Sequence, residues 1–478
     1  LLVNKKSFPI HNEKFIITLP TEILSSDNEI TIRYTAQTTQ TGEGLHRFID
    51  PVDQKTYMYT DLEPYEARRI FPCFDQPDIK ATFESKVIVP SPFLVVSTTP
   101  QSNAIQKGDT TEFTFEKSLP MSSYLFSLFV GDWSVWENTY NDIPLRMLAR
   151  QSLKDKMDPD WWFDITKRGL AFYESYFAYP YPYKKLDQIL APEYNHGGME
   201  NVAAISYGDQ YIFRHIPTED DYRQRSGLVL HEMAHQWFGD IVTMKWWDDL
   251  WLNESFASYL AYLAMVKATP HTSAWEEFSL KVKSWAYITD ASLVSHPIEG
   301  EVNSTNDAMN NFDGITYGKG AAVLQQLAFY IGEEEFQKAM QNYIKKHAYQ
   351  NATRDDFFSA LQEKTSKDLK VWKEKWLQTK GINRITADYQ CDNKTITSFS
   401  LLQETADGDN ILRPHRTILA LLSLRKGSLT ITDTLPVFVE DQHTIVRDLF
   451  QKPCPDMVFV NYQDQDYIKT RFDDKSWK

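Results

Sequence analysis

Two histidines stand four positions apart in the stretch HEMAHQWFGD, residues 231–240, with a glutamate directly after the first. On a helix, residues i and i+4 lie on one face, so His231 and His235 can direct their imidazole nitrogens at one metal ion. Glu232 projects from nearly the same side and can reach a water on that ion. A catalytic zinc ion takes three protein ligands and keeps one position open. The motif therefore supplies two ligands and a general base, and it requires a third ligand elsewhere.

The candidate third ligand is Glu254, in the segment WWDDLWLNESFASYLAYL. Eighteen residues lie between His235 and Glu254, and the apolar spacing around Glu254 predicts a packed helix with Asp248 and Asp249 at its N-cap. Glu232 and Glu254 both fall in otherwise apolar helices, where an unpaired carboxylate is costly and a cation offsets that cost. Two histidines at this spacing also occur as ordinary core residues, but the carboxylates favour a zinc site with two His ligands, one Glu ligand and one open position.

The rest of the chain has to position these residues, and its apolar patterns change twice. Residues 1 to about 148 are rich in β-branched and aromatic residues, with stretches such as ITIRYTAQT and KATFESKVIV, which predicts strands. From Trp161 the apolar spacing becomes that of helices, and from about residue 386 strand-like stretches such as RTILALLSL return. Helices are expected over residues 222–240, 249–267, 317–331 and 333–347, and a further helix is expected after the capping-box pattern of Thr353 and Asp356.

This order predicts a multidomain α+β fold. We expect an N-terminal β-domain over residues 1–148, a mostly helical catalytic domain over 149–385 and a small C-terminal β-sandwich over 386–478. At 478 residues the chain is too long for one hydrophobic core, which agrees with several domains. The β-sandwich is expected to carry no chemistry.

Charge and cysteine content narrow the functional classes. The net charge is −15 and the basic residues form no long run, which argues against nucleic-acid binding, because phosphates need a cationic surface. An acidic cleft instead attracts substrates with a positive end. Cys73, Cys391 and Cys454 are far apart without CxxC spacing, so we expect no disulfide framework and a reducing, cytoplasmic compartment. No apolar run reaches the length of a membrane-spanning helix.

The motifs resemble those of the gluzincin zinc aminopeptidases, the family of aminopeptidase N and leukotriene hydrolase. That family carries HExxH, then eighteen residues and a Glu, as this chain does, together with a GxMEN signature. The signature lies within HGGMENVAAI at residues 196–205 and comprises Gly197, Gly198, Met199, Glu200 and Asn201. The likeness extends to TDLEPYEARRIFPCFDQPD at residues 60–78 and to GITYGKGAAVL at residues 314–324, and it covers essentially the whole chain.

The resemblance implies a thermolysin-like catalytic domain with one zinc ion held by His231, His235 and Glu254. Zinc would activate a water, and Glu232 would take the proton of that water and pass it to the leaving amine. Tyr317 would donate its hydroxyl to the oxyanion of the tetrahedral intermediate. Taken by itself, Tyr317 would be interpreted as an ordinary packing residue.

The resemblance also implies the substrate, a peptide with a free N-terminal amine. Glu200 and Glu63 would bind that amine, so that one residue is removed from the N-terminus, and the GGMEN backbone would pair with the peptide as an added strand. Without the resemblance, Glu63 would be a solvated loop charge and Glu200 a turn residue. The implied function is that of a zinc-dependent aminopeptidase.

Two other functions stay open at this stage. An epoxide hydrolase of the leukotriene type has an acidic residue eight positions before the catalytic tyrosine, whereas Met309 stands there in this chain. A non-catalytic, zinc-stabilised peptide-binding module would close its metal coordination with a fourth protein ligand and would need no general base. Full-length relatives have a longer N-terminal β-domain and a large C-terminal helical domain, so we expect the sequence to be a fragment or a short form.

Overall fold

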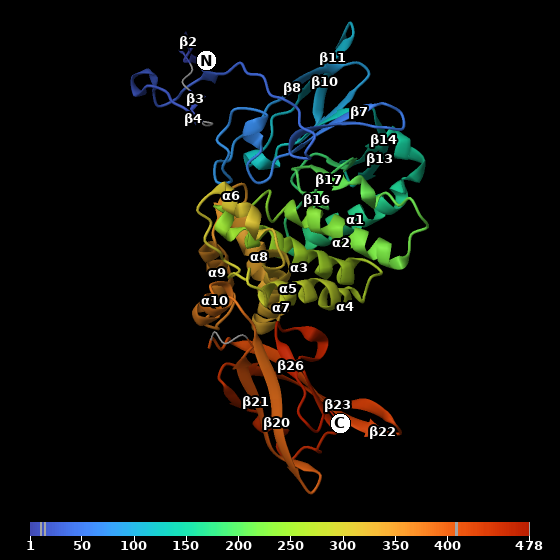
Figure 1. Ribbon diagram of the computed structural model, residues 1–478, viewed down its shortest axis with the longest axis vertical. Coiled ribbons are helices and arrows are strands. Elements are labelled where there is room, and N and C mark those ends of the chain that lie inside the picture. The colour runs from blue at the N-terminus through green and yellow to red at the C-terminus, as the bar shows by residue number, and fades with distance from the viewer. Residues whose placement is uncertain (10–11, 14–15, 407–409, 478) are drawn as a thin grey trace. The chain divides into compact units, whose positions relative to one another are not determined.

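A computed structural model describes residues 1–9, 12–13, 16–406 and 410–477 of the protein. The chain forms two compact units. The first comprises residues 1–159 and 183–216, and the second comprises residues 160–182 and 217–478. Strands predominate in the first unit, whereas the second has helices followed by strands, which confirms the predicted multidomain α+β fold (Figure 1). The finer division into three domains stays a prediction.

The N-terminal part of the first unit contains several antiparallel sheets, among them a four-stranded and a three-stranded sheet that lie after residue 43. Their strand orders are β6-β7-β12-β9 (Gly44–Ile49, Thr56–Asp61, Leu128–Gly131, Leu94–Ser97) and β10-β11-β8 (Gln101–Lys107, Thr110–Phe115, Lys86–Pro90). β7 ends at Asp61, which places Glu63 directly after the end of a strand. The strand predicted over residues 30–38 is longer than the strand that forms. Only β5 (Ile30–Thr31) forms there, because most side chains of this stretch are exposed and no buried face selects a longer strand.

A mixed five-stranded sheet completes the first unit, with the strand order β13-β14-β15-β17-β16. In that order its strands are Trp133–Tyr140, Ile143–Arg150, Leu186–Ala191, Ala204–Gly208 and Gly198–Met199. The central strand β15 runs parallel to both neighbours, and all its residues are buried, as is typical of parallel strands covered on both faces. β16 lies at the edge and pairs antiparallel with β17. The sheet thus places the GGMEN segment on an edge strand.

Helices form most of the second unit up to residue 377. The longer ones are α1 (Pro159–Phe177), α2 (Glu219–His235), α3 (Trp251–Ala268), α7 (Gly320–Ile331), α8 (Glu333–His347), α9 (Arg354–Gln362) and α10 (Lys370–Leu377). α2 begins after Thr218, whose hydroxyl accepts the Asp221 N–H while the Asp221 carboxylate accepts the Thr218 N–H. The same reciprocal cap, predicted for Thr353 and Asp356, starts α9 and is confirmed. Within the described ranges, no helix combines the length and the apolar composition of a membrane span.

The start of α3 differs from the prediction. Asp248 and Asp249 do not cap the helix but lie in a short 3₁₀ turn, and α3 follows Leu250 without a side-chain cap. Asp249 Oδ1 accepts the indole N–H of Trp251 at 3.0 Å, and Asp249 Oδ2 accepts the backbone N–H of Arg354 at 2.9 Å. The carboxylate is therefore engaged by a residue more than a hundred positions away, which a local sequence pattern does not reveal.

Two π-helical turns interrupt the segment between α3 and α7. One turn, Phe278–Lys283, joins α4 (Ala274–Glu277) to α5 (Ser284–Asp290). The other turn, Ile315–Lys319, leads directly into α7 and contains Tyr317. The sequence predicted one regular helix from residue 317, so this wider turn is an addition that only the structure provides. Such turns are rare and frequently occur at functional sites.

Two sheets form the C-terminal β-sandwich of the second unit. Their strand orders are β24-β21-β20-β26 (His443–Ile445, Thr395–Thr405, Asn383–Asp392, Lys469–Arg471) and β23-β22-β25 (Ser428–Val439, His415–Arg425, Met457–Val460). The shared core includes Phe399, Leu401, Leu419, Leu421 and Val460. The predicted C-terminal β-sandwich is therefore present, with β20 as an additional long strand.

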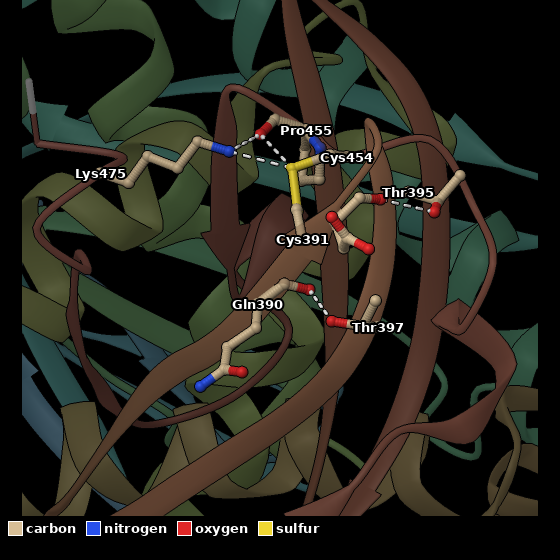
Figure 2. Close-up of a disulfide and its surroundings, with 8 residues drawn as sticks. Gln390, Cys391, Thr395, Thr397, Cys454, Pro455 and Lys475 are labelled. Carbon is tan, nitrogen blue, oxygen red and sulfur yellow. Dashed lines mark hydrogen bonds between the residues drawn. A yellow bond between two sulfur atoms is a disulfide. The ribbon is translucent and has the colours of Figure 1, made fainter.

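A disulfide joins Cys391, near the end of β20, to Cys454, which precedes β25 (Figure 2). The two cysteines are 63 positions apart in the chain, but their Cα atoms are 6.0 Å apart. Beside the bond, the Cys454 N–H donates to the Lys394 carbonyl at 2.9 Å. We expected no disulfide framework, but this pair does form a disulfide, so the cysteine content no longer supports a reducing, cytoplasmic compartment. Lys475 Nζ lies 3.1 Å from the Cys454 sulfur (Figure 2). Cys73 is a half-buried free thiol.

Replacing Cys391 or Cys454 by serine should lower the free energy of unfolding by about 2–4 kcal/mol, because the bond closes a loop between residues 63 positions apart. Equilibrium denaturation measures this loss. Dithiothreitol should produce the same loss in the wild type, and Cys73→Ser should leave that effect of dithiothreitol unchanged. Equal unfolding midpoints for oxidised and reduced protein would contradict the prediction.

Candidate active site

Two helices of the second unit bring His231, His235 and Glu254 together. The histidines lie one turn apart on α2, and Glu254 lies in the first turn of α3. His231 Nε2 is 3.0 Å from His235 Nε2 and 3.1 Å from Glu254 Oε2. His235 Nε2 is 3.5 Å from the same Glu254 oxygen. Tetrahedral ligands that lie about 2.0–2.1 Å from zinc are about 3.3 Å from one another, so these three residues fit a zinc ion.

The protonation states of these residues also suit a metal ion. Burial lowers the pKa of His231, against the opposing effect of Glu254, and this favours a neutral imidazole. Burial alone would raise the pKa of Glu254, but the charges and hydrogen bonds of His235 and His231 outweigh it and lower that pKa. Metal ions bind neutral imidazole and ionised carboxylate. These shifts favour a neutral His231 and an ionised Glu254.

Neighbouring groups fix the ring of His235. Its Nδ1–H donates to the Phe238 carbonyl at 3.0 Å and lies 3.3 Å from Asn253 Oδ1, which directs Nε2 toward Glu254. Gly239 has a φ of 126°, and a Cβ atom there would lie 2.2 Å from Asn253 Oδ1, so the close approach requires glycine. Sequence reasoning missed Phe238 and Asn253, because the motif carries no signal for a backbone carbonyl or for a residue of another helix.

Glu232 and Tyr317 lie beside the three ligands. A carboxylate oxygen of Glu232 is within 4.8 Å of a ring nitrogen of His235, and the Glu232 side chain is buried. The half-buried Tyr317 ring stacks on the His231 ring, with a centroid distance of 6.0 Å and an angle of 24°. The Trp285 ring stacks on the same tyrosine at 6.3 Å. A carboxylate and a tyrosine ring therefore both lie beside the candidate metal position.

Glu63 and Glu200 lie together in the first unit. A carboxylate oxygen of Glu63 lies within 4.8 Å of one of Glu200. Glu200 is 2% exposed and follows the edge strand β16, whereas Glu63 is half-buried. Two carboxylates this close disfavour each other's ionised form unless a cation lies near both. The pair is suited to a positively charged group such as an ammonium.

Asp61 adds a third carboxyl group, which sequence reasoning missed. It is 2% exposed, and it forms a long ion pair of 3.7 Å with the more exposed His196. Burial raises the pKa of Asp61 to about 8, and the charges of Glu43 and Glu200 act in the same direction. Asp61 is the last residue of β7 and Glu63 lies two positions beyond it, outside the strand, so no strand pattern in the sequence marks Asp61. A bound cation would favour the ionised form of Asp61.

The GGMEN residues occupy the edge of the five-stranded sheet. β16, formed by Gly198 and Met199, pairs with β17 on one side, and no described strand pairs with its other side. The Gly197 carbonyl accepts the backbone N–H of the last residue of β17 at a distance of 3.1 Å. Asn201 is fully buried, and its side-chain amide donates to Ser206 Oγ at 3.0 Å, which holds the turn between the two strands. This is the arrangement in which an extended peptide can add to a sheet edge.

Two family models match the chain and identify its class. The peptidase family M1 domain matches residues 161–376, which include both histidines, Glu254 and Tyr317. The peptidase M1 N-terminal domain matches residues 3–125, which include Glu63. The chain belongs to the M1 peptidase family, which confirms the resemblance to the aminopeptidase N family drawn from the motifs.

Several relatives are similar over most of the chain. Aminopeptidase N of Streptomyces lividans is 42% identical over 453 residues, tricorn protease-interacting factor F2 of Thermoplasma volcanium is 35% identical over 353, and aminopeptidase M1 of Arabidopsis thaliana is 35% identical over 339. The matches cover 92%, 72% and 70% of this chain, but 52%, 43% and 38% of those proteins. The chain thus spans about half of the length of these relatives, or less.

His231→Ala, His235→Ala and Glu254→Ala should each lower the zinc content of the purified protein, because each removes one of three ligands. Glu232→Gln should keep zinc while losing nearly all turnover, because the base is not a ligand. Metal analysis by mass spectrometry after identical dialysis of all variants measures this difference. A zinc-free Glu232→Gln protein would contradict the division into ligands and base.

Proposed function

We propose that the chain carries the metal-binding and substrate-binding residues of a zinc-dependent aminopeptidase, which hydrolyses the N-terminal bond of peptides. The observation that carries the proposal is the convergence of His231, His235 and Glu254 at ligand distances in a member of the M1 peptidase family. The close pair of Glu63 and Glu200 supports a substrate with a free amine. These two groups of residues belong to different compact units, and their joint action on one peptide is part of the proposal.

His231, His235 and Glu254 would hold one zinc ion. When bound, zinc supplies a Lewis acid that polarises the scissile carbonyl and acidifies water. Glu232 accepts the proton of the attacking water and delivers it to the departing amine. Its burial beside His235 places this carboxylate away from bulk solvent, where proton transfer to a competing water is limited.

Tyr317 donates its hydroxyl to the oxyanion that forms as the water attacks. The stacked rings of His231 and Trp285 restrict the orientation of its side chain. A donor that is already in place when the charge develops is worth more than one that must reorganise. Tyr317 therefore acts in the transition state and contributes little to binding of the ground state.

Glu63 and Glu200 bind the ammonium group of the substrate through charge-assisted hydrogen bonds. Asp61 adds a nearby carboxyl group whose pKa of about 8 means that a bound cation promotes its ionisation. The edge strand β16 pairs with the peptide backbone. Together these contacts fix the N-terminus, so that cleavage releases a single residue.

The two alternative functions have less support. Met309 is a partly exposed apolar side chain at the position where the epoxide hydrolase reaction requires an acid. A structural zinc module requires four protein ligands, whereas the cluster of His231, His235 and Glu254 has three members among the described residues. An open coordination position favours catalysis.

Tyr317→Phe should lower kcat by about 10²–10³ with little change in KM, because the lost hydroxyl acts in the transition state. Steady-state kinetics on an amino-acid amide and a melting curve of the same preparation measure the two effects. A near-normal kcat with a lowered melting temperature would show that Tyr317 serves packing instead.

Hydrolysis of matched peptides with free and acetylated N-termini tests the proposed function. Free peptides should lose one residue at a time from the N-terminus, whereas acetylated peptides should be cut very poorly, because the carboxylates then face no cation. Glu200→Ala should lower kcat/KM for free peptides by roughly 10- to 1,000-fold and change the value for acetylated peptides far less. Mass spectrometry of the products over time measures both rates.

Glu193→Ala is the matched control for Glu200→Ala. The Glu193 side chain belongs to the same unit and is 60% exposed, so its loss should leave the preference for free peptides unchanged. Internal cleavage of an acetylated peptide at the rate of its free counterpart would remove the amine-binding assignment and favour an endopeptidase.

A further inference from the structure

Tyr317 lies in a backbone turn that a regular α-helix does not contain. The π turn Ile315–Lys319 contains hydrogen bonds that span five positions, such as the bond from the Lys319 N–H to the Gly314 carbonyl at 2.9 Å. A π turn widens the helix and changes the direction of its side chains, and it is rare unless neighbouring groups hold it. The position of the Tyr317 hydroxyl therefore depends on the contacts that hold both ends of this turn.

The beginning of the turn is tied to a local cap and to the helix of the third ligand. Asp313 Oδ1 accepts the backbone N–H groups of Ile315 at 2.9 Å and of Thr316 at 3.2 Å. Ser255, which follows Glu254 on α3, donates to the Thr316 carbonyl at 2.6 Å. The first half of the turn is thus fixed relative to α3.

A buried ion pair holds the end of the turn. The side chains of Lys319 and Asp290 are 0% and 1% exposed, and Lys319 Nζ lies 2.8 Å from Asp290 Oδ2. Gly381, just before the β-sandwich, accepts from Lys319 Nζ at 3.1 Å and donates its N–H to Asp290 Oδ1 at 3.0 Å. The Tyr467 hydroxyl, which lies just before β26, donates to Asp290 Oδ2 at 3.4 Å. The pair therefore joins the turn, the end of α5 and the β-sandwich.

We propose that Lys319 and Asp290 are positioning residues for Tyr317, and that the β-sandwich supports them through Tyr467. The inference rests on the proposed function, because the placement of the hydroxyl matters only if it acts in hydrolysis. Lys319 is two positions from Tyr317. Separating two buried charges would leave each without its partner, at a large cost in free energy, so the pair restricts the geometry of the turn. An oxyanion donor must lie about 2.7–3.1 Å from the developing charge. A displacement of about 1 Å can cost about 10²-fold in rate.

Lys283 offers a matched control. It is also 0% exposed, and it ends the other π turn of the same helical region. Lys283 Nζ bonds to Asp464 Oδ1 at 2.8 Å and to the Asp466 carbonyl at 2.8 Å, both in the β-sandwich. Its side chain attaches the helices to the β-sandwich without contacting the Tyr317 turn through these bonds. Replacing Lys283 therefore measures the effect of losing a buried lysine and its bonds to the β-sandwich, without removing a bond that holds the Tyr317 turn.

The experiment combines Lys319→Met and Lys283→Met, each alone and with Tyr317→Phe, in the full chain loaded with zinc. Lys319→Met should lower kcat about tenfold or more, while KM and zinc content stay within about twofold. In the Tyr317→Phe background the same substitution should change kcat less than about twofold, because the hydroxyl that it positions is already absent. Lys283→Met should lower the melting temperature and should have the same small effect on kcat in both backgrounds.

Equal losses of kcat from Lys319→Met with and without the Tyr317 hydroxyl would overturn the inference, and so would an unchanged kcat in the single variant. If Lys319→Met fails to fold, Asp290→Asn and Tyr467→Phe replace it, because they keep the side-chain shape, and the same outcomes decide. A wild-type protein that releases no N-terminal residue would overturn the proposed function and this inference with it. An active wild type with additive losses would overturn the inference alone.

Discussion

The approach of two imidazoles and one carboxylate to within 3.5 Å of one another is the constraint on which the second unit depends. Polar groups this close and this well buried are costly unless a cation satisfies them. The surrounding structure holds them there nonetheless. The cap at Thr218 sets the start of α2, Gly239 lets the following chain approach Asn253, and the Phe238 carbonyl fixes the ring of His235. Under the proposed function, a bound metal ion would offset the cost of this arrangement.

The acidic residues of the first unit follow the same principle. Carboxylate oxygens of Glu63 and Glu200 lie within 4.8 Å of each other, and burial and the charges of Glu43 and Glu200 raise the pKa of Asp61, which is a cost to its ionised form. An ammonium group would offset it, as a metal ion would offset the cost at His231 and His235. Under the proposed function, the group of residues in the second unit would bind a metal ion and the group in the first unit would bind an organic cation.

The β-sandwich is more than an appended domain in this structure. Its residue Tyr467 reaches Asp290, and Asp290 holds the lysine that ends the Tyr317 turn. Arg413 adds a second buried connection, since its guanidinium donates to the Thr379 hydroxyl at 2.8 Å near the end of the helical region. The disulfide joins two segments of the same sandwich, the end of β20 and the segment before β25.

The sequence by itself determined the features that depend on local spacing. The i and i+4 spacing places His231 and His235 on one helix face, and reciprocal capping marks the start of α9, because these interactions join residues within one or two turns. The change from alternating to helical periodicity and back also predicted the β, α and β order. Tertiary structure alone decided the disulfide, the burial of Asp61, the π turn and the Lys319–Asp290 pair. Each of these depends on segments distant in the chain or on the full set of neighbours around a side chain, and a local pattern of residue types contains no measure of either.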